Sequence, residues 1–90
     1  MALFAIAMDE PKPTLVAGLK AACPTHYSFS DRTLVIRHTG GIRALIESCD
    51  LPDAERSGFV AVQINANYFG YSTGAFWDWL ATAFREDAGG

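Results

Sequence analysis

Hydrophobic positions along the first part of the chain change from a continuous run to a helical period. Residues 3–8 are uniformly apolar and stop at Asp9, and a short opening run of this kind predicts a central strand buried on both faces. Apolar residues then recur at helical spacing over residues 13–23. Pro24 ends this helix, because the residue before a proline disfavours helical dihedral angles.

The middle of the chain has the pattern of a hairpin followed by a second helix. Tyr27 and Phe29 alternate with polar residues, which is the two-residue period of a strand with one solvated face. Residues 33–38 are rich in β-branched side chains and predict the second strand of the hairpin. An apolar stripe over residues 42–49 predicts the helix, and Thr39 is suited to cap its start.

The remaining residues predict a fourth strand at 59–64, a surface loop before it at 53–58, and a last helix from about residue 73. The first six elements therefore follow the split βαβ order of ferredoxin-like domains. Two right-handed crossovers place both internal helices on one face of a four-stranded antiparallel sheet. We expect a single ferredoxin-like α+β domain over residues 1–90, whose second face needs the last helix or a partner as cover.

Composition favours association with another protein. Half of the 90 residues are hydrophobic, including six Phe, three Tyr and two Trp. A domain of this size buries only roughly 60–65% of its unfolded surface, so some apolar side chains are expected to need a partner. The net charge is −3 and the basic residues are scattered, which disfavours nucleic acid as that partner. We expect a homodimer or a complex with another protein.

Sequence features also predict the compartment. The apolar run that opens the chain has no basic leader and is shorter than the roughly 20 residues of a membrane-spanning helix. Two cysteines, Cys23 and Cys49, are too few for a disulfide-dense secreted scaffold. We expect a cytoplasmic protein without membrane association. The two cysteines close separate helical stripes, and we expect them to lie at opposite ends of the sheet as buried, unbridged residues.

The chain resembles a group of small proteins related to the CRISPR-associated integration-complex subunit, which includes VapD-like toxins and SinR-like proteins. Three segments carry the resemblance: the opening strand that ends at Asp9, the hairpin from His26 to Arg37, and the closing segment Phe76-Trp-Asp-Trp-Leu80. Members of this group are ferredoxin-like homodimers. Some are metal-dependent nucleases that use the acid at the strand end, and the resemblance implies that role for Asp9.

Asp9 is consequently the one candidate catalytic and metal-binding residue. Its carboxylate suits a hard cation such as Mg²⁺ or Mn²⁺, and a symmetric dimer would bring two copies together. The alternative is that Asp9 caps the start of the helix and Glu10 is solvated. We favour this structural role, because one carboxylate per chain is a sparse metal site. No other cofactor is expected.

The aromatic residues near the C-terminus are the other candidate site. This set consists of Tyr68, Phe69, Tyr71, Phe76, Trp77 and Trp79. Aromatic side chains stack on single-stranded bases, but such platforms normally include arginines and lysines, and this stretch has none before Arg85. Tyr and Trp also favour protein interfaces. We favour packing and partner contact over base stacking.

Two weaker signals complete the candidates. His26 and His38 lie on the two strands of the hairpin, where they form either a metal or acid–base site or two exposed histidines at a strand edge, and we favour the second. The segment Thr39-Gly40-Gly41 opens a helix but lacks the lysine of a phosphate-binding loop. The leading hypothesis is a homodimeric interaction or regulatory protein without catalysis, and the alternative is a metal-dependent nuclease using Asp9.

Overall fold

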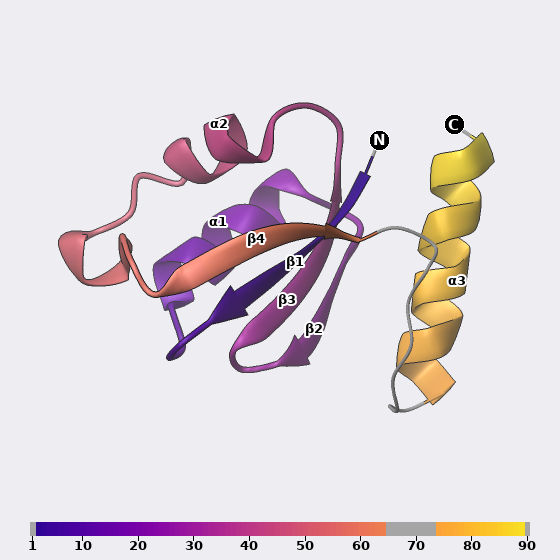
Figure 1. Cartoon of the computed structure of the whole chain (residues 1–90), viewed down its shortest axis with the longest axis horizontal. Coiled ribbons are helices and arrows are strands. Elements are labelled where there is room, and N and C mark those ends of the chain that lie inside the picture. The colour runs from indigo at the N-terminus through magenta and orange to yellow at the C-terminus, as the bar shows by residue number, and fades with distance from the viewer. Residues whose placement is uncertain (1, 65–73, 90) are drawn as a thin grey trace.

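The computed structural model describes residues 2–64 and 74–89 of the chain. In these residues the elements follow one another in the predicted order (Figure 1). The strands and helices are β1 (Ala2–Met8), α1 (Pro13–Ala22), β2 (His26–Ser30), β3 (Thr33–His38), α2 (Ile42–Glu47), the 3-10 helix η1 (Asp53–Glu55), β4 (Phe59–Ile64) and α3 (Gly74–Gly89).

The four strands form one antiparallel sheet in the order β2-β3-β1-β4. β1 is central, as its apolar run predicts, and Ala5 lies between Val35 of β3 and Val62 of β4. β2 and β4 are the two edges. This α+β arrangement is compatible with a ferredoxin-like fold, although the second crossover contains only the six-residue helix α2 and the short η1.

The main core lies between the sheet and the helices α1 and α2. Phe4, Ile6 and Met8 of β1 point to this side and pack on Leu15 and Leu19 of α1. Leu19 and Ile6 are fully buried. The spacing of Leu15 and Leu19 places both on one face of α1, which explains why the predicted helical stripe is the buried one. Both internal helices therefore cover the same side of the sheet, as expected.

A second, smaller core lies on the opposite side, where α3 packs (Figure 1). Phe76, Leu80 and Ala83 of α3 lie at helical spacing and bury against Leu3 and Val35 of the sheet. Within the described part of the chain this helix covers one end of the second face. Of the two covers expected for this face, the last helix or a partner, the helix packs on part of it.

Two local expectations are wrong and a third is incomplete. Thr39 does not cap α2, because the helix begins after Gly41 and receives no side-chain cap. The segment 53–58 is at the surface, as expected, but it contains the 3-10 helix η1, and its Glu55 is buried. β1 is expected to be buried on both faces. One face is buried along its whole length, but on the other face Ala7 is exposed. Among the described helices, none is long and apolar enough to cross a membrane.

Candidate functional site

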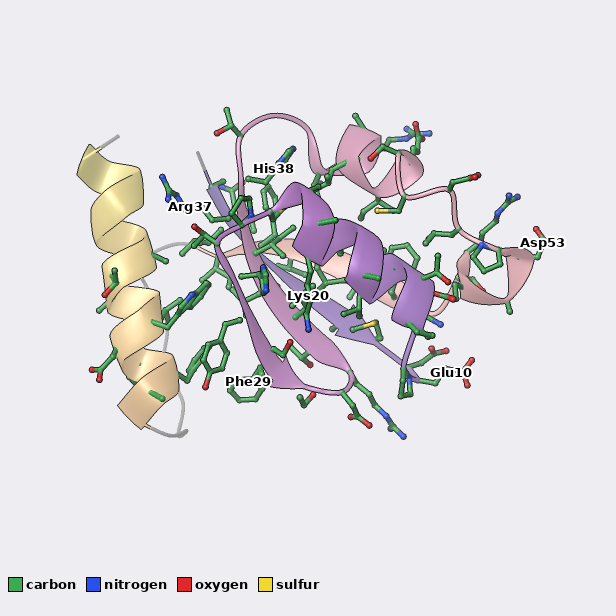
Figure 2. The ribbon with its side chains drawn as sticks, turned by 180° about the vertical axis from the view of Figure 1, so that it is seen from behind. Glu10, Lys20, Phe29, Arg37, His38 and Asp53 are labelled. Atoms are coloured by element: carbon green, nitrogen blue, oxygen red, sulfur yellow. The ribbon has the colours of Figure 1, made fainter. Side chains whose placement is uncertain are left out.

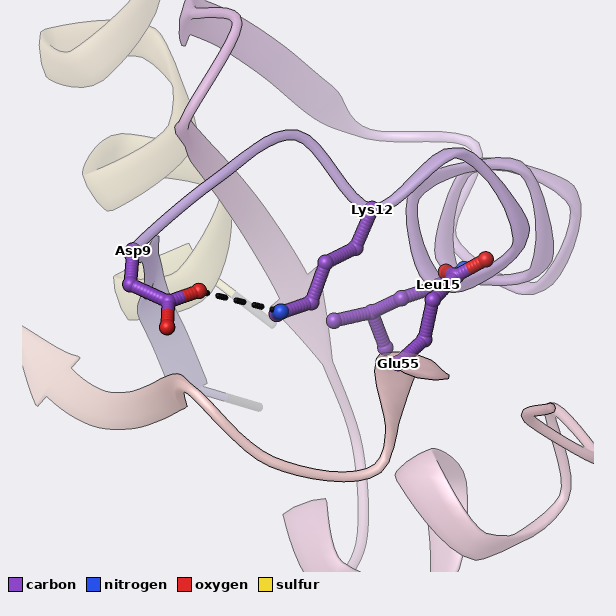
Figure 3. A network of polar contacts seen from close by, with 4 residues as sticks. All are labelled: Asp9, Lys12, Leu15 and Glu55. Carbon is purple, nitrogen blue, oxygen red and sulfur yellow. Dashed lines mark hydrogen bonds and ion pairs between the residues drawn. The ribbon is translucent and has the colours of Figure 1, made fainter. Parts of the chain in front are cut away.

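Asp9 lies immediately after β1 and contacts two other segments of the chain (Figure 3). Its backbone N–H donates a 2.7 Å hydrogen bond to the carbonyl of Gly58, just before β4. Its Oδ1 lies 3.0 Å from the Nζ of Lys12. Gly58 has φ +81°, and a Cβ there would overlap the Asp9 carboxylate. Glycine is therefore required at position 58 both by the backbone conformation and by the contact with Asp9.

Lys12 is an unusual residue because its long side chain is almost completely enclosed. It is only 2% exposed, whereas its partner Asp9 is 64% exposed. A buried ammonium group is costly unless it is paired, so the Asp9 carboxylate is the partner that allows Lys12 to be buried. Asp9 has a structural role of its own in this position.

The start of α1 is capped from a distant part of the chain. Glu55 of η1 accepts hydrogen bonds from the backbone N–H groups of Leu15, at 2.9 Å, and Thr14, at 3.3 Å. These are amide groups of the first helical turn, which have no partner inside the helix. Glu55, and not Asp9, therefore satisfies the start of α1, and the predicted capping role of Asp9 is wrong.

We define the charged cluster as Asp9, Lys12 and Glu55. Both of its carboxylates are held in their charged forms. The hydrogen bond from Lys12 lowers the pKa of Asp9, and the charge of Lys12 acts in the same direction. Burial raises the pKa of Glu55, but the hydrogen bonds from Leu15 and Thr14 and the charge of Lys12 outweigh it, so the pKa is lowered overall. Both carboxylates are consequently ionised at neutral pH.

The catalytic and metal-binding role of Asp9 remains a prediction. The carboxylate is accessible, but one of its oxygens is engaged by Lys12. Among residues 2–64 and 74–83, whose side chains the structure describes, no group of three or more His, Cys, Asp or Glu residues is placed to hold a metal ion. A cation at Asp9 would have to compete with the ammonium group that the carboxylate already neutralises.

The two histidines do not lie exposed at a strand edge as expected. Both His26 and His38 are half-buried. The Nδ1 of His26 lies 2.7 Å from the carbonyl oxygen of Cys23, so this ring helps to hold the turn between α1 and β2. The register places His26 opposite Ile36, so His38, two residues further along β3, is its diagonal neighbour on the same face of the sheet.

The cysteines are unbridged, as expected, but they are not remote from each other. Cys23 is buried and Cys49 is half-buried. Burial raises the pKa of the Cys23 thiol, and the neighbouring charge of Cys49 raises it further. Cys49 packs against Gly18 of α1, where an added Cβ would lie 2.9 Å from its Sγ. The expectation that the two residues lie at opposite ends of the sheet is therefore wrong.

The predicted aromatic set is only partly described by the structure. Tyr68, Phe69 and Tyr71 lie outside the described residues. Phe76 is buried, and its ring lies 5.2 Å from that of Tyr27 and 4.9 Å from that of Phe29. Trp77 and Trp79 are half-buried and pack at the margin of the same core, so part of each remains accessible. Their role in an interface stays a prediction.

An exposed apolar strip follows β1 and β4 on the side of the sheet that carries α3. We define this open strip as Ala5, Ala7, Val60 and Val62. The register places Val60 beside Ala7 and Val62 beside Ala5, and each valine is 54% exposed. On the same side Phe29, labelled in Figure 2, points from β2 toward α3 and is 46% exposed. Sequence analysis expected this face to need a cover but did not identify the four residues of the open strip, because β4 carries apolar residues on both of its faces.

A hollow of about 340 Å³ lies between the end of α2 and the start of β4. Its lining includes the apolar residues Ile46, Leu51 and Phe59 and the charged residues Glu47, Asp50 and Arg56. Glu47 is bound to Arg43 at 3.1 Å, and Arg56 lies 3.3 Å from Asp53. Because two of its charged groups already have partners, the hollow offers a ligand mainly apolar surface.

The chain was also compared with known proteins. No protein-family model, curated protein or solved structure matches it.

Proposed function

We propose that the chain is a small ferredoxin-like domain that functions as a homodimeric interaction or regulatory protein of the CRISPR-associated or toxin–antitoxin-like group it resembles. The observation that carries the proposal is the open strip. Two valines that are each 54% exposed lie beside two alanines of the neighbouring strand. Contiguous apolar surface of this kind is typical of protein-binding sites.

The chemistry of the open strip favours a protein over a nucleic acid. None of its four residues is charged, and β4 as a whole (Phe-Val-Ala-Val-Gln-Ile) contains no basic residue. Nucleic-acid binding depends on lysine and arginine contacts with phosphates, which this surface does not supply. An uncharged strand is complementary to another uncharged strand, and a second copy of this chain provides one.

The experiment is a measurement of mass by light scattering at micromolar to hundred-micromolar concentrations. Wild type is expected to show the mass of a dimer. Val62→Lys places a charge in the open strip and is expected to give a monomer. Ser28→Lys introduces the same charge at an exposed position on the opposite edge of the sheet, and this matched control is expected to remain dimeric. A monomeric wild type throughout this range would overturn the proposal.

A second candidate function is metal-dependent cleavage of nucleic acid by a dimer that pairs two Asp9 carboxylates. It rests on the exposure of Asp9 at the end of a strand, and it is weakened by the Lys12 ion pair. The assay measures cleavage of RNA and DNA with Mg²⁺ or Mn²⁺, comparing wild type with Asp9→Asn. Cleavage that disappears in Asp9→Asn would support this function, and cleavage that persists would exclude Asp9 from the mechanism.

A further inference from the structure

The two edges of the sheet differ in how well they are protected against pairing with another strand. β2 is short, contains three polar residues in five, and is interrupted by a register shift between Ser28 and Ser30. β4 pairs with β1 over six consecutive residues without a shift, and it contains neither a charge nor a proline. Bulges, charges and prolines are the usual means by which proteins prevent edge-to-edge association. β4 has none of them.

The hydrogen bond at the end of β1 shows which backbone groups of β4 face outward. Asp9 donates to Gly58, and these two residues are opposite each other in the register that continues from β1 and β4. Hydrogen-bonded and non-bonded pairs alternate along an antiparallel ladder. Val60, Val62 and Ile64 therefore direct their N–H and C=O groups toward β1. The corresponding groups of the other three β4 residues, Phe59, Ala61 and Gln63, point away from the sheet.

Symmetry limits how a second β4 can use these groups. In an antiparallel pair related by a two-fold axis, one residue lies opposite its own copy. If that residue is Ala61, Phe59 lies opposite Gln63 of the partner subunit, and all three outward-facing residues form hydrogen-bonded pairs. If Val60 or Val62 is central, one of the three falls outside the paired length of β4. The register centred on Ala61 uses the edge most fully.

We propose that two copies of the chain join through β4 in antiparallel orientation, centred on Ala61, to form one continuous eight-stranded sheet. This inference rests on the proposed homodimer and specifies its geometry. Val60 then lies opposite Val62 of the partner subunit as a non-hydrogen-bonded pair, in which side chains approach most closely. The two open strips meet along this line, because pairing about the two-fold axis keeps the same face of both sheets on the same side.

Single-cysteine cross-linking tests the register. In Ala61→Cys the two new thiols lie opposite each other, where a Cα separation of about 5.5 Å permits a disulfide. Mild oxidation is expected to convert this variant into a covalent dimer on a non-reducing gel. Wild type, which retains the native Cys23 and Cys49, and Ser28→Cys on the β2 edge serve as controls and are expected to remain uncross-linked. Preferential cross-linking of Val60→Cys or Val62→Cys would overturn the register.

A proline variant tests the edge itself. The N–H of Ala61 points outward, so Ala61→Pro removes no bond to β1 but removes the central bonds of the dimer. This variant is expected to keep the far-UV circular dichroism of wild type and to be monomeric by light scattering. A dimeric Ala61→Pro would overturn pairing through β4 and leave the homodimer intact, whereas a monomeric wild type would overturn both proposals. If Ala61→Pro does not fold, the cross-linking result decides.

Discussion

Leu80→Ala should release α3 from the sheet before the rest of the domain unfolds. Leu80 is 2% exposed and lies at the centre of the smaller core, between Phe76 and Ala83 on the same helical face. Truncation of a buried leucine to alanine removes three carbon atoms and leaves a cavity, which costs about 2.5–4 kcal/mol. The main core between the sheet and α1 does not contain Leu80. The loss therefore falls on the docking of α3.

The free energy of unfolding of a domain of this size is about 5–15 kcal/mol. The free energy lost in Leu80→Ala is therefore large compared with that of docking a single helix, but it does not remove the stability of the complete fold. Both tryptophans of the chain, Trp77 and Trp79, lie in α3 and report its docking by fluorescence. Far-UV circular dichroism reports all helices and strands together, so the sheet and α1 keep part of its signal after α3 has been released. In wild type the two urea transitions are expected to coincide, and in Leu80→Ala the fluorescence transition is expected at lower urea.

The control is Asp78→Ala, an exposed position of the same helix, which should leave both transitions coincident. If Leu80→Ala shifts the two transitions together by the same amount, α3 is an inseparable part of the cooperative unit and the reasoning fails. If neither transition moves, Leu80 does not anchor the helix.

Three further predictions concern the cluster of charged residues and the contact between α1 and Cys49. Because the pKa of Asp9 is lowered in the fold, its ion pair with Lys12 stabilises the protein above about pH 4, and this stabilisation is lost as the pH falls through the lowered pKa. The urea midpoints of wild type and Asp9→Asn should therefore differ at pH 7 and converge toward pH 2. Glu55→Ala should lower the helical circular dichroism and the urea midpoint more than Glu55→Gln, which keeps one carbonyl acceptor for the first turn of α1. Gly18→Ala gains about 0.5–1 kcal/mol of helix propensity, but its Cβ would lie 2.9 Å from the Sγ and 3.2 Å from the Cβ of Cys49. The substitution should therefore be more favourable in a Cys49→Ala background, which removes the Sγ contact, than in wild type, and equal effects in the two backgrounds by urea titration would show that the Sγ contact is unimportant.

The elements of the fold follow from local sequence patterns, and their errors have local causes. α1 has an apolar stripe at helical spacing, and β3 is a short run rich in β-branched residues, so the boundaries of both are predicted correctly within a residue or two. Thr39 fails as a cap because Gly40, at φ +106°, bends the chain and delays the helix to Ile42. A single glycine decides this boundary, and hydrophobic periodicity does not register it.

The cluster around Lys12 was not predictable, because its members are close only in the folded chain. Glu55 caps a helix about 40 residues earlier in the sequence, and no local spacing indicates such a contact. Glu55 belongs to a charged stretch that is typical of solvated loops, and Lys12 lies between two prolines, where a lysine is usually exposed. Only the three-dimensional arrangement shows that both side chains are buried.

Asp9 bears on both proposed functions, because it is the candidate catalytic residue and also lies next to the edge strand β4. Its N–H and its carboxylate both contact Gly58, immediately before the edge strand β4. Because the Asp9 carboxylate lies against Gly58, which leads into β4, a change of the Asp9 side chain can shift the start of the edge available to a second copy. Loss of cleavage in Asp9→Asn therefore indicates a catalytic carboxylate only if the variant remains dimeric. Joint loss of cleavage and of the dimer would instead assign Asp9 to the positioning of β4.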